Sequence, residues 1–259
     1  MSEFEQSAVF TPFTLPSGLT LKNRVVKAAM EENLAEADLT PSQVLKNVYN
    51  EWAKGGCGLI FTGNVMVDHL AMTGPGGLAL EQQTDITPFA ELARLGQQND
   101  CKIVMQINHP GRQVFKKMGG KALSASDIAL NMGKHSHLFA QPTAMDKSEI
   151  SDVIARFTHT AQQAEKAGFN GVQIHAAQGY LLAQFLSPLT NKRDDEWGGS
   201  LENRARLLLE ITRSIKAQCS AGFSVSVKLN SADFQRGGFE PHDAQAVVNM
   251  LSALKLDFV

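Results

Sequence analysis

Three side chains that can form hydrogen bonds follow a short apolar run in the segment GVQIHAAQGYLLAQFLSP, residues 171–188. His175 ends the apolar run, and Gln178 and Tyr180 follow it within five residues. A histidine at the end of a strand is ordinarily a polar group satisfied by its neighbours, but a loop can turn all three side chains into one cavity. His175 and Gln178 could then hold a carbonyl oxygen and stabilise negative charge on it, with Tyr180 as the proton donor.

The same segment offers no activated nucleophile. No serine or cysteine stands in an evident arrangement with a base and a third group that orients the base, so acyl transfer is disfavoured. A polarised carbonyl next to a proton donor suggests addition of hydride to an activated carbon. Because protein side chains do not donate hydride, this chemistry requires a cofactor.

Short apolar runs alternate with helical periods along the chain, which predicts parallel strands joined by right-handed crossovers. Thr40 and Pro41 are expected to begin one helix, a second runs from Ser148 to a stop at Gly168, and Ser200 caps a third. A long polar stretch, 109–147, interrupts this alternation after the third strand. The expected strands are 24–30, 58–63, 102–108, 171–175, 224–230 and 256–259.

Two parallel architectures fit this alternation: an open doubly wound sheet and a closed (β/α)8 barrel. A doubly wound nucleotide-binding sheet usually has a glycine-rich turn after its first strand, and residues 28–36 contain no glycine. Polar residues instead collect at the carboxyl ends of several strands, and those ends meet at one mouth in a barrel. The pattern therefore favours the barrel. The residues at these ends are Gln106, Asn108, His175, Lys228 and Asn230.

Composition excludes several classes of protein. A formal net charge of -2 gives no electrostatic reason to expect nucleic acid or an anionic membrane as a partner. The three cysteines are widely spaced with no C-x-x-C pair, so neither a disulfide framework nor a metal site is expected. The first residues, 1–13, lack the basic and apolar regions of a secretory signal, which makes a cytoplasmic location the expectation.

Five blocks of the sequence resemble the old yellow enzyme family, the FMN-containing NADH:flavin oxidoreductases and enone reductases. The resemblance implies a (β/α)8 TIM barrel with FMN across its C-terminal mouth. It also implies that NAD(P)H reduces the flavin, which then passes hydride to the β-carbon of an α,β-unsaturated carbonyl compound. The partners it implies are a small enone-type substrate and a possible second copy of the chain. The blocks are LKNRVVKAAM (21–30), WAKGGCGLIFTGNVMVD (52–68), MQINHPGRQ (105–113), HAAQGYLLAQFLSPLTNKRDDEWGGSLENRARLL (175–208) and VKLNSADFQRGGFE (227–240).

The resemblance also assigns roles to individual positions. His175 and Gln178 match the donors to the substrate carbonyl, and Tyr180 matches the proton donor. The other matched positions contact the flavin: backbone and small side chains at the first two strand ends, an amide for the pyrimidine ring and a cation near flavin N1. In chain order these are Ala28, Ala29, Met30, Gly63, Asn64, Gln106 and Lys228.

The chain departs from the family pattern at three places. The family usually has His or Asn where this chain has Gln178, and Glu31 stands where some members place a cysteine that tunes the flavin. The chain stops at Val259, inside the expected sixth strand, so the sequence predicts one FMN-binding TIM-barrel domain over 1–259 without strands seven and eight. An alternative stays open, in which the chain is a truncated, cofactor-free barrel fragment with only a structural or binding role.

Overall fold

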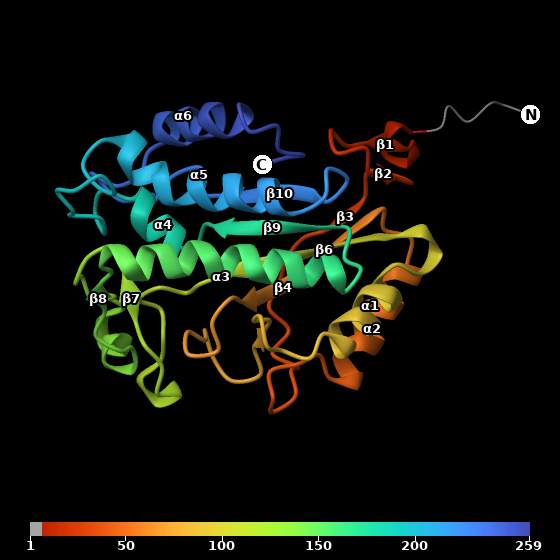
Figure 1. Ribbon diagram of the computed structural model, residues 1–259, viewed down its shortest axis with the longest axis horizontal. Helices are drawn as coiled ribbons and strands as arrows, with labels where there is room; N and C mark the ends of the chain where they lie inside the picture. Colours follow the sequence, from red (N-terminus) through yellow and green to blue (C-terminus); the bar gives the residue numbers. More distant parts are fainter. Residues whose placement is uncertain (1–6) are drawn as a thin grey trace, which may run out of the picture.

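A computed structural model describes residues 7–259, and a parallel sheet forms its centre (Figure 1). The spatial order of the strands is β10-β9-β6-β4-β3, and the short β5 adds to the end of β4. Every pair in this sheet is parallel, as the alternation of strands and helices predicts. The strands are β3 (Val26–Lys27), β4 (Leu59–Met66), β5 (Leu78–Ala79), β6 (Lys102–Asn108), β9 (Gly171–Ala176) and β10 (Ser224–Leu229).

The strand predictions hold best in the middle of the sheet. β6, β9 and β10 agree with the expected ranges to within one residue at each end. β3 keeps only two residues of the expected 24–30, and β4 runs three residues past its expected end, with a shift in register between Phe61 and Asn64. Within 256–259 the described chain forms a single bridge, from Phe258 to Ser226.

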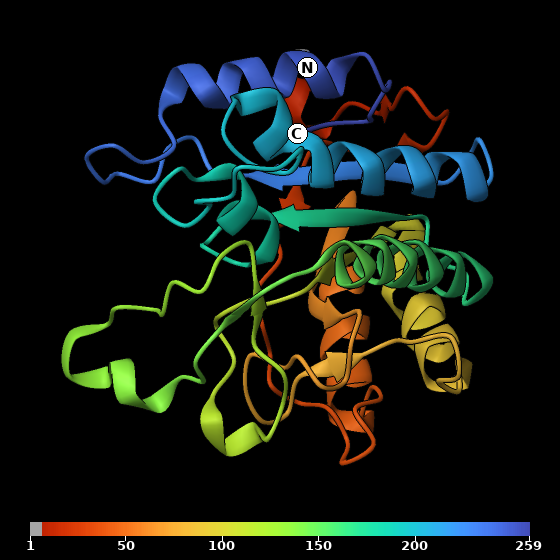
Figure 2. The same cartoon turned by 60° about the vertical axis from the view of Figure 1, so that its left-hand side comes forward.

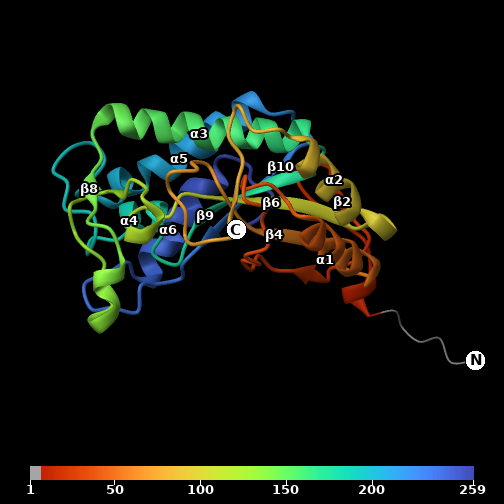
Figure 3. The ribbon, with the colours of Figure 1, turned by 90° about the horizontal axis from the view of Figure 1, so that it is seen from below.

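Helices cover one face of the sheet, with α3 packed on α5 and α1 packed on α2 (Figure 3). Most of the apolar core lies between these helices and the strand residues that point toward them. The helices are α1 (Gln43–Lys54), α2 (Thr87–Gly96), α3 (Lys147–Lys166), α4 (Leu181–Leu186), α5 (Leu201–Gln218) and α6 (Pro241–Ser252).

Two of the three expected helix starts are displaced. Thr40 does not cap α1, because its hydroxyl donates to Asp38 Oδ1 at 2.7 Å; the cap is Ser42, whose hydroxyl accepts from the Leu45 N–H at 3.1 Å. Asp146 rather than Ser148 caps α3. The expected Ser200 cap of α5 is confirmed.

The two faces of the strands differ in polarity because successive side chains point to opposite sides. In β9, Val172 and Ile174 lie in the main apolar core, so Gln173 and His175 point to the inner face. A smaller apolar cluster covers the other end of this inner face, where Phe61 packs edge-on against Phe258 at 5.6 Å. The carboxyl-terminal part of the inner face is left to polar side chains.

Irregular segments occupy both ends of the sheet. The hairpin of β1 (Phe13–Thr14) and β2 (Thr20–Leu21) lies at the end where the strands begin (Figure 1). The stretch 109–147 extends away from the sheet (Figure 2) and contains the short parallel pair β7 (Leu123–Ser124) and β8 (Thr143–Ala144). It also holds two 3-10 turns, Lys116–Met118 and Gly133–Leu138; two more are Ala8–Phe10 and Gln98–Asp100.

None of the helices formed by residues 7–259 is long and apolar enough to cross a membrane. Residues 1–6, the first part of the segment 1–13 in which no secretory signal is expected, lie outside the described residues.

The cap of α1 gives a test of this fold. Replacing Ser42 by alanine leaves the Leu45 N–H without its acceptor and should lower the free energy of unfolding by about 1 kcal/mol. Urea unfolding followed by circular dichroism measures this loss as a lower midpoint with an unchanged slope. Ser151→Ala, on the exposed side of α3, is the control, and an equal loss in both variants would contradict the assignment.

Candidate active site

The register of the sheet brings the polar strand ends together. Gln106 of β6 is paired with Gln173 of β9, and His175 of β9 is paired with Lys228 of β10. The Gln106 side chain donates from Nε2 to Gln173 Oε1 at 2.8 Å in a buried hydrogen bond. Three neighbouring strands therefore deliver polar side chains to one rim of the inner face.

The three residues predicted to act on a substrate lie in contact with one another. His175 Nδ1 accepts from the Ala177 N–H at 3.2 Å, so the neutral imidazole carries its proton on Nε2. That Nε2 donates to Gln178 Oε1 at 3.2 Å, and the Tyr180 ring stands edge-on to the imidazole at 4.9 Å between centroids. In this arrangement His175 is already paired with Gln178, and the exposed Gln178 presents its NH2 group as the free donor.

The imidazole of His175 is held neutral. Only 2% of this residue is exposed, and burial lowers its pKa to about 4, with the nearby positive charge of Lys228 contributing in the same direction. A neutral imidazole at pH 7 can donate one hydrogen bond without bringing a full charge into the site.

The surroundings of Tyr180 make its phenol a weaker acid than an exposed tyrosine. Burial raises the pKa of its phenol, and the carboxylate of Glu31 raises it further. Glu31 itself accepts a hydrogen bond from the Thr73 hydroxyl at 2.5 Å. The residue that departs from the family pattern after the first strand therefore acts electrostatically on the predicted proton donor.

Gly63 lies inside β4, at the shift in register between Phe61 and Asn64 and not at the expected end of the strand, and it is packed too closely for any side chain. A Cβ there would lie 2.3 Å from Glu32 Oε2 and 2.6 Å from the Met30 carbonyl oxygen. The Tyr49 hydroxyl fixes this approach, since it accepts from the Gly63 N–H at 2.9 Å and donates to Glu32 Oε1 at 2.7 Å. The segment that follows β3 therefore packs directly on the backbone of β4 at Gly63.

The remaining predicted flavin contacts lie just after β3 or in the carboxyl-terminal halves of β4, β6 and β10. Ala28 and Met30 are exposed, and Ala29 is half-buried. Asn64 is buried, and its Oδ1 has no hydrogen-bond partner among the described residues. Lys228 lines a cavity of about 550 Å³ on the inner face, whose other lining residues are largely apolar and include Leu15, Leu21 and Phe61. The orphaned amide oxygen of Asn64, the exposed Ala28 and Met30 and the cation of Lys228 fit an amphipathic ring cofactor such as FMN.

Several residues of the rim were not predicted as site residues. Gln173 lines the same cavity as Lys228, and it stands two residues before His175, so the alternation of the strand could have identified it. The sequence marks Asn230 only as a polar residue at a strand end, and it indicates no role for Gln113. Both bind the backbone of Gln178, a contact that nothing in the local sequence reveals.

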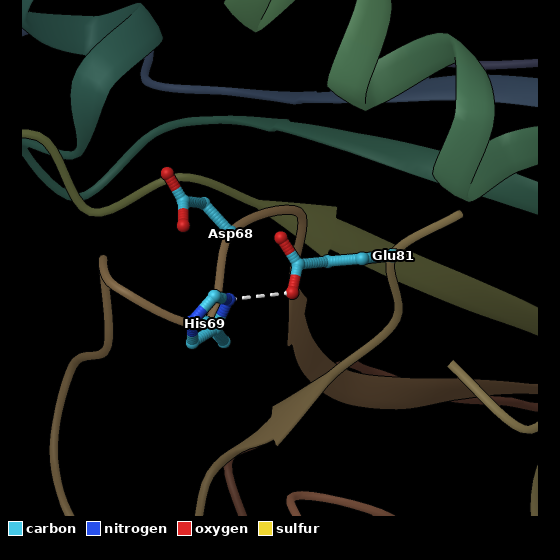
Figure 4. Close-up of side chains that lie close together, drawn as sticks. All are labelled: Asp68, His69 and Glu81. Carbon is cyan, nitrogen blue, oxygen red and sulfur yellow. Dashed lines mark hydrogen bonds and ion pairs between the residues drawn. The ribbon is translucent and has the colours of Figure 1, made fainter. Parts of the chain in front are cut away.

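A separate polar cluster follows β4, formed by Asp68, His69 and Glu81 (Figure 4). Their ligand-type atoms lie within 4.8 Å of one another, and His69 Nδ1 is 2.7 Å from Glu81 Oε2. The guanidinium of Arg156 donates to Glu81 at 2.8 Å and to Asp152 at 2.6 Å. Glu81 and Asp152 therefore share the cation of Arg156. The cluster is part of an ion-pair network beside α3.

Comparison with known proteins places this geometry in a family. Residues 8–259 match the model of the NADH:flavin oxidoreductase / NADH oxidase family. The chain belongs to this family. FMN, with NAD(P)H as reductant, is the cofactor set that this membership implies, as the sequence blocks predict.

Relatives and solved structures agree with the family. The NADH-dependent flavin oxidoreductase nadA of Aspergillus parasiticus is 39% identical over 251 residues, and the NADH oxidase of Thermoanaerobacter brockii is 36% identical over 239. The alignments cover 92% and 90% of this chain but only 56% and 36% of those proteins. The chain thus spans little more than half of the first relative and about a third of the second.

Two solved structures show the same fold. The old yellow enzyme homologue of Zymomonas mobilis superimposes with a TM-score of 0.85 at 28% identity, covering 97% of this chain and 72% of that one. A 2-naphthoyl-CoA reductase superimposes with a TM-score of 0.91 at 26% identity, covering 97% and 40%. The parallel sheet is therefore a curled half-barrel of the old yellow enzyme type.

The link between Glu31 and Tyr180 can be measured directly, because the chain has only two tyrosines. Burial and Glu32 raise the pKa of Tyr49 well above its usual value, so Tyr180 should ionise first in an alkaline titration of tyrosinate absorbance. Glu31→Gln should lower the first transition, whereas the control Glu32→Gln should change only the second. An unmoved first transition in Glu31→Gln would refute the link.

Two buried histidines predict how stability depends on pH. Burial lowers the pKa of His109 and of His175 from 6.5 to about 4, so the unfolded chain binds more protons than the folded one between these values. The free energy of unfolding should therefore fall as the pH is lowered through this window. His109→Asn keeps an acceptor for the Gly111 N–H and should flatten the fall; an unchanged pH slope in urea titrations would argue against it.

Proposed function

We propose that this protein is a flavin-dependent oxidoreductase that takes hydride from NAD(P)H and reduces an activated alkene, an α,β-unsaturated carbonyl compound. The observation that carries the proposal is the contact among His175, Gln178 and Tyr180 at the rim where Gln106 and Lys228 also emerge. An imidazole, an amide and a phenol gathered at one rim suit a polarised carbonyl and a protonated carbon.

Each of the three residues has one task. The NH2 group of Gln178 donates to the substrate carbonyl oxygen, and His175 orients that amide through its own hydrogen bond to Oε1. The NH2 group of Gln178, held in place by His175, stabilises the negative charge that develops on the oxygen. Tyr180, a phenol that is protonated at pH 7, delivers a proton from its hydroxyl to the neighbouring carbon and becomes a phenolate.

The remaining residues hold the cofactor. When bound, FMN supplies the hydride transfer between NAD(P)H and the alkene. Ala28, Ala29 and Met30 would support its ring. Gly63, Asn64 and Gln106, in the carboxyl-terminal halves of β4 and β6, would bind its pyrimidine edge. Lys228 would stabilise negative charge on it.

The site and one structural neighbour support the proposed substrate class. The 2-naphthoyl-CoA reductase was solved in complex with 2-naphthoyl-CoA, a conjugated carbonyl compound. We extend this class, a small molecule with an activated double bond, to the present chain. We also propose that residues 1–259 contribute to a single FMN-binding (β/α)8 domain; a cytoplasmic location and a homo-oligomer stay predictions from the sequence.

The alternative, a cofactor-free binding element, makes a different prediction for the purified protein. A flavin enzyme is yellow and releases FMN on denaturation. A binding element is colourless as purified, and it stays colourless after incubation with FMN and removal of the unbound FMN. The family membership and the orphaned Asn64 amide oxygen support the flavin enzyme.

The role of Tyr180 is tested by separating the two half-reactions. Tyr180→Phe removes the proton donor and should slow reduction of the alkene by about a hundredfold or more. Reduction of the flavin by NADH needs no proton from Tyr180 and should stay near the wild-type rate, which makes it the internal control. Stopped-flow absorbance measures both steps, and an equal loss in both would show that Tyr180 is not the proton donor.

A further inference from the structure

The loop that carries Gln178 makes an unusual turn. Tyr180 N–H donates to the Ala177 carbonyl at 3.2 Å, and both central residues of the turn have positive φ, 58° at Gln178 and 72° at Gly179. Glycine adopts this conformation freely, and asparagine tolerates it, but a longer side chain such as glutamine pays about 1–2 kcal/mol. Gln178 therefore needs external support to stay in this conformation.

That support comes from two side chains on separate elements. Asn230, just after β10, accepts the Gln178 N–H on its Oδ1 at 3.0 Å. Gln113, in the loop after β6, donates from Nε2 to the Gln178 carbonyl at 2.9 Å. Together with the bond from His175 to the side chain, three elements of the half-barrel bind three different groups of Gln178.

The loop that carries Gln113 is itself rigid. The Gln113 N–H donates to the Pro110 carbonyl at 3.1 Å. Gln184, of which 1% is exposed, donates to the same Pro110 carbonyl at 3.1 Å and to the Gly179 carbonyl at 2.7 Å. The buried amide of Gln184 thus binds both the turn and the loop after β6. These hydrogen bonds fix the position of the loop from which Gln113 binds Gln178.

We propose that Gln113 and Asn230 are positioning residues that hold Gln178 in its left-handed conformation and so aim its NH2 group at the substrate carbonyl. The proposal rests on the proposed function for the identity of what Gln178 binds. Its physical basis is preorganisation: a donor fixed before the substrate arrives loses little entropy on binding, and a displacement of about 1 Å is enough to lose much of its effect. The two clamps have opposite polarity, since Asn230 accepts and Gln113 donates.

This opposite polarity allows a test with the same chemical change at both positions. Asn230→Asp keeps an accepting oxygen and should rescue the loss seen in Asn230→Ala, whereas Gln113→Glu replaces a donor by an oxygen that faces the Gln178 carbonyl. Para-cresol serves as a mimic of the substrate oxygen. Gln113→Glu and Asn230→Ala should each raise the Kd of para-cresol about tenfold, to the value expected for Gln178→Ala. Gln43→Glu, on the exposed face of α1, is the matched control and should leave the Kd unchanged. The Kd for FMN should be the same in all variants.

A second measurement does not depend on the flavin. Hydrogen exchange of the peptide 176–182 should be faster in Asn230→Ala, which exposes the Gln178 N–H, and in Gln113→Glu, which loosens the turn. It should return toward the wild-type rate in Asn230→Asp. Exchange in the α3 peptides should not change, which separates a local effect from unfolding.

The outcomes distinguish this proposal from the proposed function. If the protein binds FMN and reduces an enone but Gln113→Glu keeps its affinity for para-cresol, or Asn230→Asp is as weak as Asn230→Ala, the positioning role is overturned. If the protein binds no FMN, the proposed function fails, and unchanged exchange in the variants would overturn the positioning role as well.

Discussion

The structure depends on one constraint, the alternation of side chains along parallel strands that are paired in register. In β9, Val172 and Ile174 point to the helices and build the apolar core, so Gln173 and His175 must point inward. Register then sets His175 beside Lys228 and Gln173 beside Gln106. The burial that stabilises the sheet is therefore also what gathers the polar side chains at one rim.

Burial also sets the chemistry of that rim. The same removal from water that lowers the pKa of His175 raises that of Tyr180, because in both cases the charged form is disfavoured. The charges of Lys228 and Glu31 act in the same direction as burial at these two groups. Near pH 7 the imidazole is therefore uncharged and the phenol is protonated, so Tyr180 holds a proton that it can deliver, leaving a phenolate behind.

Gln178 links the site to the rest of the fold. Its side chain binds His175, and its backbone binds Asn230 and Gln113 across the mouth of the half-barrel. A glutamine in a left-handed turn is a local cost, and these contacts explain how the structure sustains it. The departure from the usual His or Asn of the family is thus accommodated by residues outside the turn.

The sequence by itself determined the parallel alternation, three of the strands almost to the residue, the grouping of His175, Gln178 and Tyr180, and the family. These are short-range properties, carried by periodicity and by spacings of a few residues. Only the tertiary structure decided that Thr40 binds Asp38 instead of capping α1, and that Gln178 is held by Asn230 and Gln113. The partners of Gln178 lie 52 and 65 residues away along the chain, and only the folding of the sheet brings such distant groups within hydrogen-bonding distance.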